Sequence, residues 1–373
     1  MPPHTDAHSD TSSSVEDLRS IPYNHAAHYQ QIRNLAPAAR PLKPGIYCPT
    51  PAFFDPITED IDLDTTALHA VRLANAGMAG IVTQGSNGEA VHLSHEERQL
   101  ITHTTREALD EAGFHDIPVL VGCGAQSTRE TIQLCREASA AGGEYAMVLP
   151  PSYYRTLYAG ESQLDFFRDV ADKSPIPIII YNFPGAASGI DLDSDAIIKL
   201  SKYPNIVGCK LTCGNTGKLG RIANACAPGF MTMAGSCDFT LQSLVVGGKG
   251  VIGGLANIAP RTSVETYNLY MEGKVELAQK MQAILARGDW VVIKGGVVAT
   301  KSALMSHFKY GGYGRKPLPR PTTSQDADVK DEIQELIHLE EFLSKGSREQ
   351  DVHIGRFKQF PDLVHLEQRL ASV

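Results

Sequence analysis

The sequence feature that most limits how this chain can fold is a set of eight short apolar runs, separated by longer amphipathic stretches. Runs that are apolar throughout indicate strands covered on both faces, as in a parallel sheet. Eight strand–helix units between about residues 45 and 270 match the number and size of a (β/α)8 TIM barrel. The runs are GIYCPT (45–50), GIVTQG (80–85), IPVLVGCG (117–124), YAMVLP (145–150), IPIIIYN (176–182), NIVGCK (205–210), FMTMAG (230–235) and GVIGG (250–254).

Helical patterns follow the last apolar run, at 274–288, 290–307 and 328–345. The predicted fold class is therefore α/β, a (β/α)8 TIM barrel with a C-terminal helical extension. A doubly wound sheet is the structural alternative, but no G-x-G-x-x-G follows the first run to support a dinucleotide site. The expected parts are a mobile N-terminal extension (1–42), the barrel (43–272), C-terminal helices packed on it (273–345) and a tail of unknown role (346–373).

The net charge and the cysteine content limit the kinds of partner and bound group that this chain is expected to have. A net charge of −8 and a pI near 5.9 give no overall attraction to nucleic acid or anionic membranes, so small molecules are the expected partners. No apolar run is long enough to span a membrane. Seven scattered cysteines without a C-x-x-C pair indicate reduced thiols rather than disulfides or a zinc site.

The first residues lack an apolar signal core and are acidic at Asp6, Asp10, Glu16 and Asp17. This composition argues against secretion and against a mitochondrial presequence. We therefore expect a cytoplasmic protein.

Active sites of such barrels lie at the carboxyl ends of the strands. The sixth run ends in Lys210 and the fifth reaches Tyr181, while GSNGE (85–89) follows the second and PPSYYR (150–155) the fourth. Taken singly, each has a structural explanation; a lysine at a strand end, for example, commonly packs its stem and leaves its charge in water. Together they converge on one mouth. No carboxylate pair or histidine cluster ends these strands, so metal-assisted hydrolysis fits poorly and neither metal nor cofactor is expected.

These residue types suit aldol chemistry. A partly buried lysine can attack a ketone as the neutral amine, and the resulting iminium accepts the electrons released when a neighbouring C–C bond breaks. Tyr181, one strand before Lys210, can shuttle protons during the reaction. Amides in the GSNGE segment can hold a substrate carboxylate.

Residues from about 43 to 345 resemble the dihydrodipicolinate synthase and N-acetylneuraminate lyase family of pyruvate-dependent class I aldolases. The resemblance is carried by QGSNGE (84–89), YNFP (181–184) and NIVGCK (205–210), in the family's order and approximate spacing. It implies that Lys210 forms the imine and that Tyr181 transfers protons.

The resemblance also implies roles for other residues. Ser86 and Asn87 would hold the pyruvyl carboxylate, and Gly235 and Ile252 fall where backbone groups of the family line the pocket. Tyr153 matches a tyrosine that family members lend across a subunit interface to complete a catalytic proton relay with the residues at Ser86 and Tyr181, which implies a homodimer or homotetramer.

The segment after Tyr181 bears on the substrate. Family members that act on aspartate semialdehyde carry an arginine there, whereas this chain has PGAASG (184–189). QGSNGE resembles 4-hydroxy-2-oxoglutarate aldolases, while FPGAASGIDL (183–192) and KLTCGNTGKL (210–219) resemble fungal 2-keto-3-deoxy-L-galactonate aldolases of galacturonate breakdown.

The first expectation is therefore cleavage of 2-keto-3-deoxy-L-galactonate to pyruvate and L-glyceraldehyde, with Ser188 near the aldehyde half. The alternative is a 4-hydroxy-2-oxoglutarate aldolase giving pyruvate and glyoxylate, for which Arg155 is the nearby cation. Two other classes stay open: an inactive barrel that only binds keto acids, and a barrel isomerase with GGKGVIGG (247–254) as a phosphate loop. These glycines are explained more simply by a helix end and a short strand.

Overall fold

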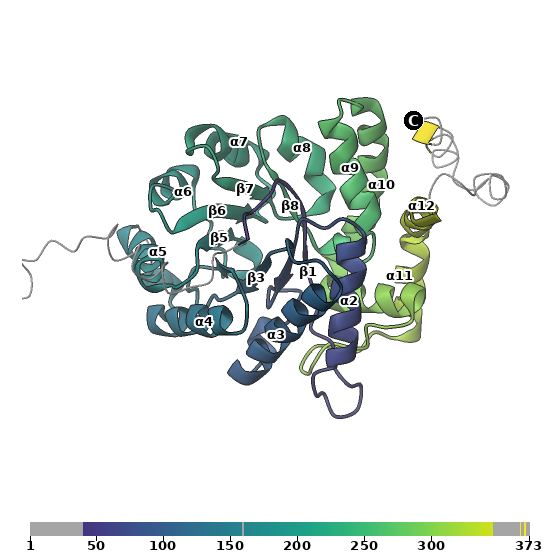
Figure 1. Cartoon of the computed structure of the whole chain (residues 1–373), viewed down its shortest axis with the longest axis horizontal. Coiled ribbons are helices and arrows are strands. Elements are labelled where there is room, and N and C mark those ends of the chain that lie inside the picture. The colour runs from purple at the N-terminus through teal and green to yellow at the C-terminus, as the bar shows by residue number, and fades with distance from the viewer. Residues whose placement is uncertain (1–39, 159, 346–365, 367–368, 371–373) are drawn as a thin grey trace, which may run out of the picture.

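The computed structural model describes residues 40–158, 160–345, 366 and 369–370. Most of the expected N-terminal extension and of the C-terminal tail lies outside these residues. Eight parallel strands form a closed barrel in chain order, with the last strand paired to the first, as predicted (Figure 1). The strands are β1 (Gly45–Pro49), β2 (Gly80–Thr83), β3 (Val119–Gly122), β4 (Tyr145–Val148), β5 (Ile178–Asn182), β6 (Ile206–Leu211), β7 (Met231–Ala234) and β8 (Gly250–Ile252).

Helices between the strands form a ring around the barrel (Figure 1). Their polar starts are visible in the sequence: Ser94 and Glu97 form a capping box, in which each side chain accepts a hydrogen bond from the other residue's backbone N–H. The ring consists of α2 (Leu63–Asn75), α3 (His95–Glu111), α4 (Thr128–Ala140), α5 (Glu161–Lys173), α6 (Ser194–Leu200), α7 (Thr216–Ala225), α8 (Thr240–Val245) and α9 (Pro260–Met271).

Between the barrel and residue 345 the structure describes three further helices: α10 (Val275–Phe308), α11 (Thr323–Glu332) and α12 (Gln334–Lys345). Helix α10 packs against α9 and against two 3-10 turns that follow β7 and β8, η5 (Cys237–Phe239) and η6 (Gly254–Asn257). Helix α10 therefore reaches the mouth formed by the carboxyl ends of the strands.

Helix α10 is interrupted at a different residue from the one that the sequence pattern indicates. The two helical patterns in the sequence are separated at Asp289. The helix continues through Asp289, because this carboxylate is buried and accepts hydrogen bonds from the Ser236 hydroxyl (2.6 Å) and the Asp238 backbone N–H (2.9 Å). The non-helical backbone lies instead at Gly296 (φ 58°, ψ −146°), a conformation that glycine adopts without steric cost.

The barrel interior is filled by one cluster of side chains, here called the inner cluster. Its members alternate along the strands with residues that face the surrounding helices. Tyr47 and Tyr145 close the end of this cluster that faces the segment before β1. Their hydroxyls donate to the backbone carbonyls of Lys43 and Arg40 in that segment. The inner cluster consists of Tyr47, Val82, Leu120, Tyr145, Met147, Ile179, Tyr181, Met231, Met233 and Ile252.

A β-bulge interrupts the pairing of β5 with β6. Ile178 pairs with Ile206, but Ile179 pairs with Gly208, so Val207 is an extra residue in β6. Val207 packs against the inner cluster, and Gly208 is the register partner of Met231 from the same cluster. Two successive residues of β6 thus belong to the interior side.

Candidate active site

Lys210 and Tyr181 meet at the end of the inner cluster that lies towards the carboxyl ends of the strands. Lys210 on β6 and Tyr181 on β5 are register partners, and both residues are buried, with 3% and 2% of their surface exposed. The Lys210 Nζ atom lies 4.2 Å from the centre of the Tyr181 ring. A ring face at this distance stabilises positive charge on the nitrogen, whether that charge belongs to an ammonium or to an iminium.

Ser86 extends this pair into a chain of polar groups. It follows β2, and its Oγ atom lies 3.3 Å from the Tyr181 hydroxyl. Phe183 stacks on the Tyr181 ring, with centroids 5.8 Å apart and planes 25° apart, and so limits the orientations of that ring. The Tyr181 hydroxyl is therefore positioned to exchange protons with Ser86 beside the Lys210 amine.

The 85–89 loop carries Ser86 and Asn87 and approaches strand β4 and the turn η6. A Cβ at Gly85 would lie 3.7 Å from the Met147 methyl group of β4. The amide nitrogen of Asn87 is only 2.6 Å from the place that a Cβ at Gly254 would take. Asn87 therefore lies closer to residue 254 than a side chain there would allow without a shift of the Asn87 amide.

Gly235 and Ile252 lie at the ends of β7 and β8, as expected from the sequence. Ile252 is buried in the inner cluster, to which Tyr181 also belongs. A Cβ at Gly235 would overlap the Thr212 Oγ1 atom, so the two strand ends approach closely there. That these two residues touch a ligand stays a prediction.

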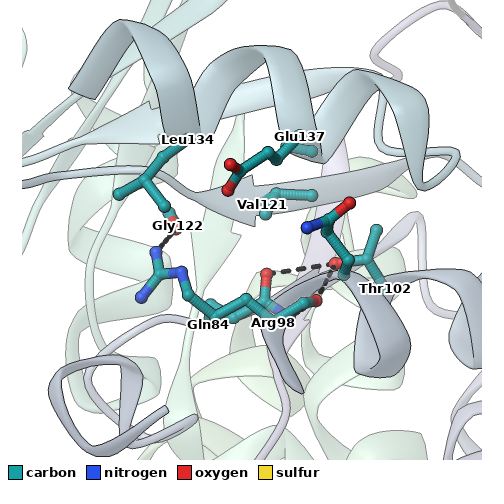
Figure 2. Close-up of a pocket in the computed structure, with 9 residues that line it drawn as sticks. Gln84, Arg98, Thr102, Val121, Gly122, Leu134 and Glu137 are labelled. Carbon is teal, nitrogen blue, oxygen red and sulfur yellow. Dashed lines mark hydrogen bonds between the residues drawn. The ribbon is translucent and has the colours of Figure 1, made fainter. Parts of the chain in front are cut away.

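Gln84, the residue before the 85–89 loop, is held by hydrogen bonds with Arg98 and Thr102 (Figure 2). The Gln84 side chain donates to the Arg98 carbonyl oxygen (2.9 Å) and accepts from the Thr102 hydroxyl (3.1 Å). Arg98 in turn donates to the carbonyl oxygens of Gly122 (2.6 Å) and Ala90 (2.8 Å). The cavity among these residues, about 10 Å³, has room for no more than one water, so it is a packing gap rather than a substrate site.

Tyr153 is not brought to this constellation within one chain. It lies 79% exposed on the loop after β4, where the N–H groups of Ser152 and Tyr153 bind the Gln126 side chain at 2.9 Å. Among the hydrogen bonds of the described residues, none joins the Tyr153 hydroxyl to Ser86 or Tyr181. Its role in a neighbouring subunit stays a prediction.

Arg155, on the same loop, reaches the turn that follows β5. Its guanidinium atoms lie 3.5–3.6 Å from the place that a Cβ at Gly189 would take. Gly189 and its neighbour Ser188 both have left-handed backbone, with φ of 80° and 50°. The 184–189 turn carries no cation of its own, but Arg155 supplies one from the adjacent loop.

Hydrogen bonds and an ion pair hold the residues on either side of this turn together. Asn182, the residue after Tyr181, donates to the Asp191 carboxylate (2.7 Å) and accepts from the Leu192 N–H (2.9 Å). The buried Lys218 ammonium bonds to Asp191 and to the Leu192 carbonyl oxygen (2.7 Å). Burial alone would raise the pKa of Asp191, but the Asn182 hydrogen bond and the Lys218 charge together lower the pKa below its ordinary value.

Two carboxylates lie near the end of β7. Burial raises the pKa of Asp289 to about 6, and the neighbouring Asp238 carboxylate adds to the effect. Burial also raises the pKa of Asp238. The hydrogen bonds that Asp289 accepts from Ser236 and the Asp238 N–H lower the pKa of Asp289, but by less than burial raises it.

Sequence reasoning assigned no role to Gln84, Asn182, Lys218, Glu89 or Lys301, although all five are buried polar residues around the site. The available signal was a charged residue inside an otherwise apolar run, as at Lys301 in VVATKSALM (297–305).

The described residues hold no group of three or more His, Cys, Asp or Glu side chains arranged to bind a metal ion. Within the same part of the chain, no helix has the length and apolar character needed to cross a membrane. All seven cysteines lie in this part and are free, five of them buried.

Comparison with known proteins adds the family. A family model described as the dihydrodipicolinate synthetase family matches residues 50–339. An Emericella nidulans protein named "Probable 4-hydroxy-2-oxoglutarate aldolase, mitochondrial" is 59% identical over 303 residues, covering 81% of this chain and 98% of that protein. A Hypocrea jecorina protein named L-threo-3-deoxy-hexylosonate aldolase is 48% identical, covering 83% and 100%. A crystal structure of a dihydrodipicolinate synthase family protein from Coccidioides immitis superposes with a TM-score of 0.73 at 35% identity, covering 81% and 98%.

Proposed function

Because this chain belongs to the dihydrodipicolinate synthetase family, we propose that Lys210 is its Schiff-base lysine and that it releases pyruvate from a 4-hydroxy-2-oxo acid. The chain is an aldolase of this family and hence a carbon–carbon lyase. The observation that carries the proposal is the buried Lys210 amine over the Tyr181 ring, with the Tyr181 hydroxyl in reach of Ser86.

The proposed reaction begins when the Lys210 amine attacks the C2 carbonyl of the substrate. Loss of water gives an iminium, which the face of the Tyr181 ring stabilises. The Tyr181 hydroxyl gives its proton to the departing water as the iminium forms, and its oxygen then takes the proton of the 4-hydroxyl as the C3–C4 bond breaks, the aldehyde leaves, and the electron pair moves into the enamine. Protonation at C3 and hydrolysis then release pyruvate and regenerate the amine.

The 85–89 loop suits the substrate carboxylate. Ser86 and Asn87 offer side-chain donors and backbone N–H groups at the end of β2, next to Tyr181. A carboxylate held there directs the neighbouring C2 carbon towards Lys210.

For the second half of the substrate, Arg155 favours 4-hydroxy-2-oxoglutarate, which would give pyruvate and glyoxylate. A distal carboxylate needs a cationic or multiple-donor partner, and the Arg155 guanidinium lies against Gly189 in the turn after Tyr181. The name of the Emericella relative supports the same substrate. This reverses the order expected from the sequence, which rested on the absence of a cation in the turn itself.

The second candidate is 2-keto-3-deoxy-L-galactonate, giving pyruvate and L-glyceraldehyde in galacturonate degradation. Ser188 supports it, because this exposed hydroxyl lies on the same turn and suits a polyhydroxy aldehyde. The name of the Hypocrea relative, a 3-deoxy sugar-acid aldolase, supports the same class of substrate.

Trapping with borohydride tests the reaction. Incubation with pyruvate and borohydride, followed by peptide mass mapping, should modify Lys210 alone, and Lys210→Ala should stay folded without being modified or active. Modification of another residue, or none, contradicts the proposed mechanism. Pyruvate release from the two substrates, compared as kcat/KM, then decides between them.

We also propose a homo-oligomer, a homodimer or homotetramer, that completes the site with Tyr153 from a second copy. The exposed apolar side chains Tyr153, Tyr154 and Leu157 on one loop support such an interface. Light scattering of the purified protein gives the mass, and full activity in a monomer would contradict the shared site.

The cytoplasmic location is likewise a proposal, supported by the acidic residues Asp6, Asp10, Glu16 and Asp17. The Emericella relative carries the word mitochondrial in its name, so the two compartments need to be separated by experiment. Fractionation of cells with an antibody to this chain would do so.

A further inference from the structure

A buried ion pair joins the 85–89 loop to the C-terminal helices. The Lys301 ammonium of α10 lies 2.7 Å from the Glu89 carboxylate, and both side chains are 1% exposed. The two residues are 212 positions apart in the chain. Glu89 directly ends the segment that carries Ser86 and Asn87, so this contact acts on the loop that the proposed function assigns to the substrate carboxylate.

Further contacts complete the environment of the pair. The second Glu89 oxygen accepts from the Arg315 backbone N–H (2.9 Å) and pairs with the His92 ring at 3.1 Å. Lys301 also donates to the Tyr313 carbonyl oxygen (2.8 Å) and lies over the Phe54 ring, 4.4 Å from its centre. Glu89 is therefore held on one side by α10 and on the other by the segment that follows it.

Arg315 ties this segment to the barrel a second time. Its guanidinium makes a bidentate pair with the Glu97 carboxylate of α3 (2.6 and 2.8 Å) and donates to the His92 carbonyl oxygen (2.8 Å). The residues that surround Glu89 are thus themselves fixed, which makes the Glu89 carboxylate a firm anchor for the loop.

The backbone of the loop needs such an anchor. Glu89 has φ 48°, and Gln84, at the other end of the loop, also has φ 48°. Non-glycine residues adopt this left-handed conformation only where their surroundings hold them. Gln84 is held by Arg98 and Thr102 within the barrel, whereas Glu89 is held from outside it, by Lys301.

A buried pair of this kind is a poor way to gain stability alone. Burial lowers the pKa of Lys301 although Glu89 raises it, which reflects the cost of removing both charges from water. Apolar side chains of similar volume would pack there without that cost. What the ion pair supplies is a directional contact with one defined geometry.

We propose that Glu89 and Lys301 are positioning residues, through which the C-terminal helices hold the 85–89 loop so that Ser86 and Asn87 receive the substrate carboxylate. The proposal rests on the function proposed above for that loop. It assigns to α10 a part in substrate binding, although Lys301 itself touches no substrate.

The test compares Glu89→Gln, which keeps the size of the side chain, with Lys301→Met. Both variants should raise the KM for the 4-hydroxy-2-oxo acid about tenfold, with a smaller change in kcat, because the binding groups lose their fixed position. Backbone amides of residues 85–90 should exchange hydrogen faster in both variants, while those of β3 keep their wild-type rates.

Glu144→Gln is the matched control. Glu144 is a buried carboxylate at the opposite end of the barrel, where it accepts from the Val119 N–H (3.0 Å) and the Arg40 side chain (2.9 Å). This variant should lower thermal stability without raising KM. The same pattern in Glu89→Gln and Lys301→Met, or a global loss of folding in both, would mean that the pair only stabilises the core and would overturn the proposal.

Hydrogen exchange separates this inference from the proposed function. If wild-type protein fails to form a borohydride-stable adduct with pyruvate, the aldolase mechanism fails. Faster exchange confined to residues 85–90 would still support the anchoring of the loop by Lys301.

Discussion

The Lys210 amine lies over the face of the Tyr181 ring, 4.2 Å from its centre, and the two residues are register partners on neighbouring strands. One tyrosine can therefore serve two purposes, since its ring stabilises a positive nitrogen while its hydroxyl faces Ser86. Removal of the hydroxyl alone separates the two contributions.

Tyr181→Phe keeps the ring and removes the hydroxyl that we propose transfers protons. We expect kcat to fall about 10²–10⁴-fold, the usual contribution of a general acid–base, while borohydride trapping of pyruvate on Lys210 becomes slower but still occurs. Tyr153→Phe should lower kcat much less. Equal losses in the two variants would contradict a direct role for Tyr181 in the bond-breaking step.

Arg155→Ala tests the choice of substrate. If the guanidinium beside Gly189 binds a distal carboxylate, kcat/KM for 4-hydroxy-2-oxoglutarate should fall about tenfold to a hundredfold, the value of a charge-assisted hydrogen bond. Activity on 2-keto-3-deoxy-L-galactonate should change little. Thr156→Ala, on the same exposed turn, is the control, and a uniform loss on both substrates would restore the sugar acid to first place.

Gly254→Ala should displace Asn87. The added methyl group would lie 2.6 Å from the Asn87 amide nitrogen, so that side chain has to move away from its place in the 85–89 loop. Loss of one hydrogen bond to the substrate carboxylate predicts a KM increase of about tenfold. Gly217→Ala in α7, whose nearest neighbour is an ordinary 3.5 Å away, should leave KM unchanged. An unchanged KM in Gly254→Ala would remove Asn87 from the binding site.

Asp289 predicts how stability depends on pH. Its pKa is raised by burial to about 6 from 3.8, so the folded state binds its proton more tightly than the unfolded state does. The corresponding stability, at most about 3 kcal/mol, is fully present below pH 3.8 and is lost as the pH rises through about 6.

Asp289→Asn keeps an oxygen that can accept from Ser236 and the Asp238 N–H, but it carries no charge. Relative to this variant, the melting temperature of the wild-type protein should fall between pH 4 and pH 7. Parallel curves for the two proteins would show that Asp289 ionises as an ordinary carboxyl group does.

The barrel, and the meeting of the core of the candidate site at one end of it, could be predicted from the sequence, because both depend on local pattern. Each strand is an apolar run, and the residue that ends a run must lie at one end of the barrel, which assigned Lys210, Tyr181 and the 85–89 loop. The contacts of Lys301 with Glu89 could not be predicted, since no local pattern links residues 212 positions apart. The reach of the Arg155 side chain depends on its rotamer, which sequence does not determine.

The bulge at Val207 makes the site depend on the length of a strand as well as on its residues. In a regular strand that starts with Ile206 on the outer side, Lys210 would face the helices and Cys209 the interior. Deletion of Val207 would remove the bulge and leave Ile206, Gly208, Cys209 and Lys210 in regular alternation, so the amine would still face the interior. The bulge and the extra residue therefore offset each other: a β6 of this length places its amine in the barrel only because one residue is left out of the pairing with β5.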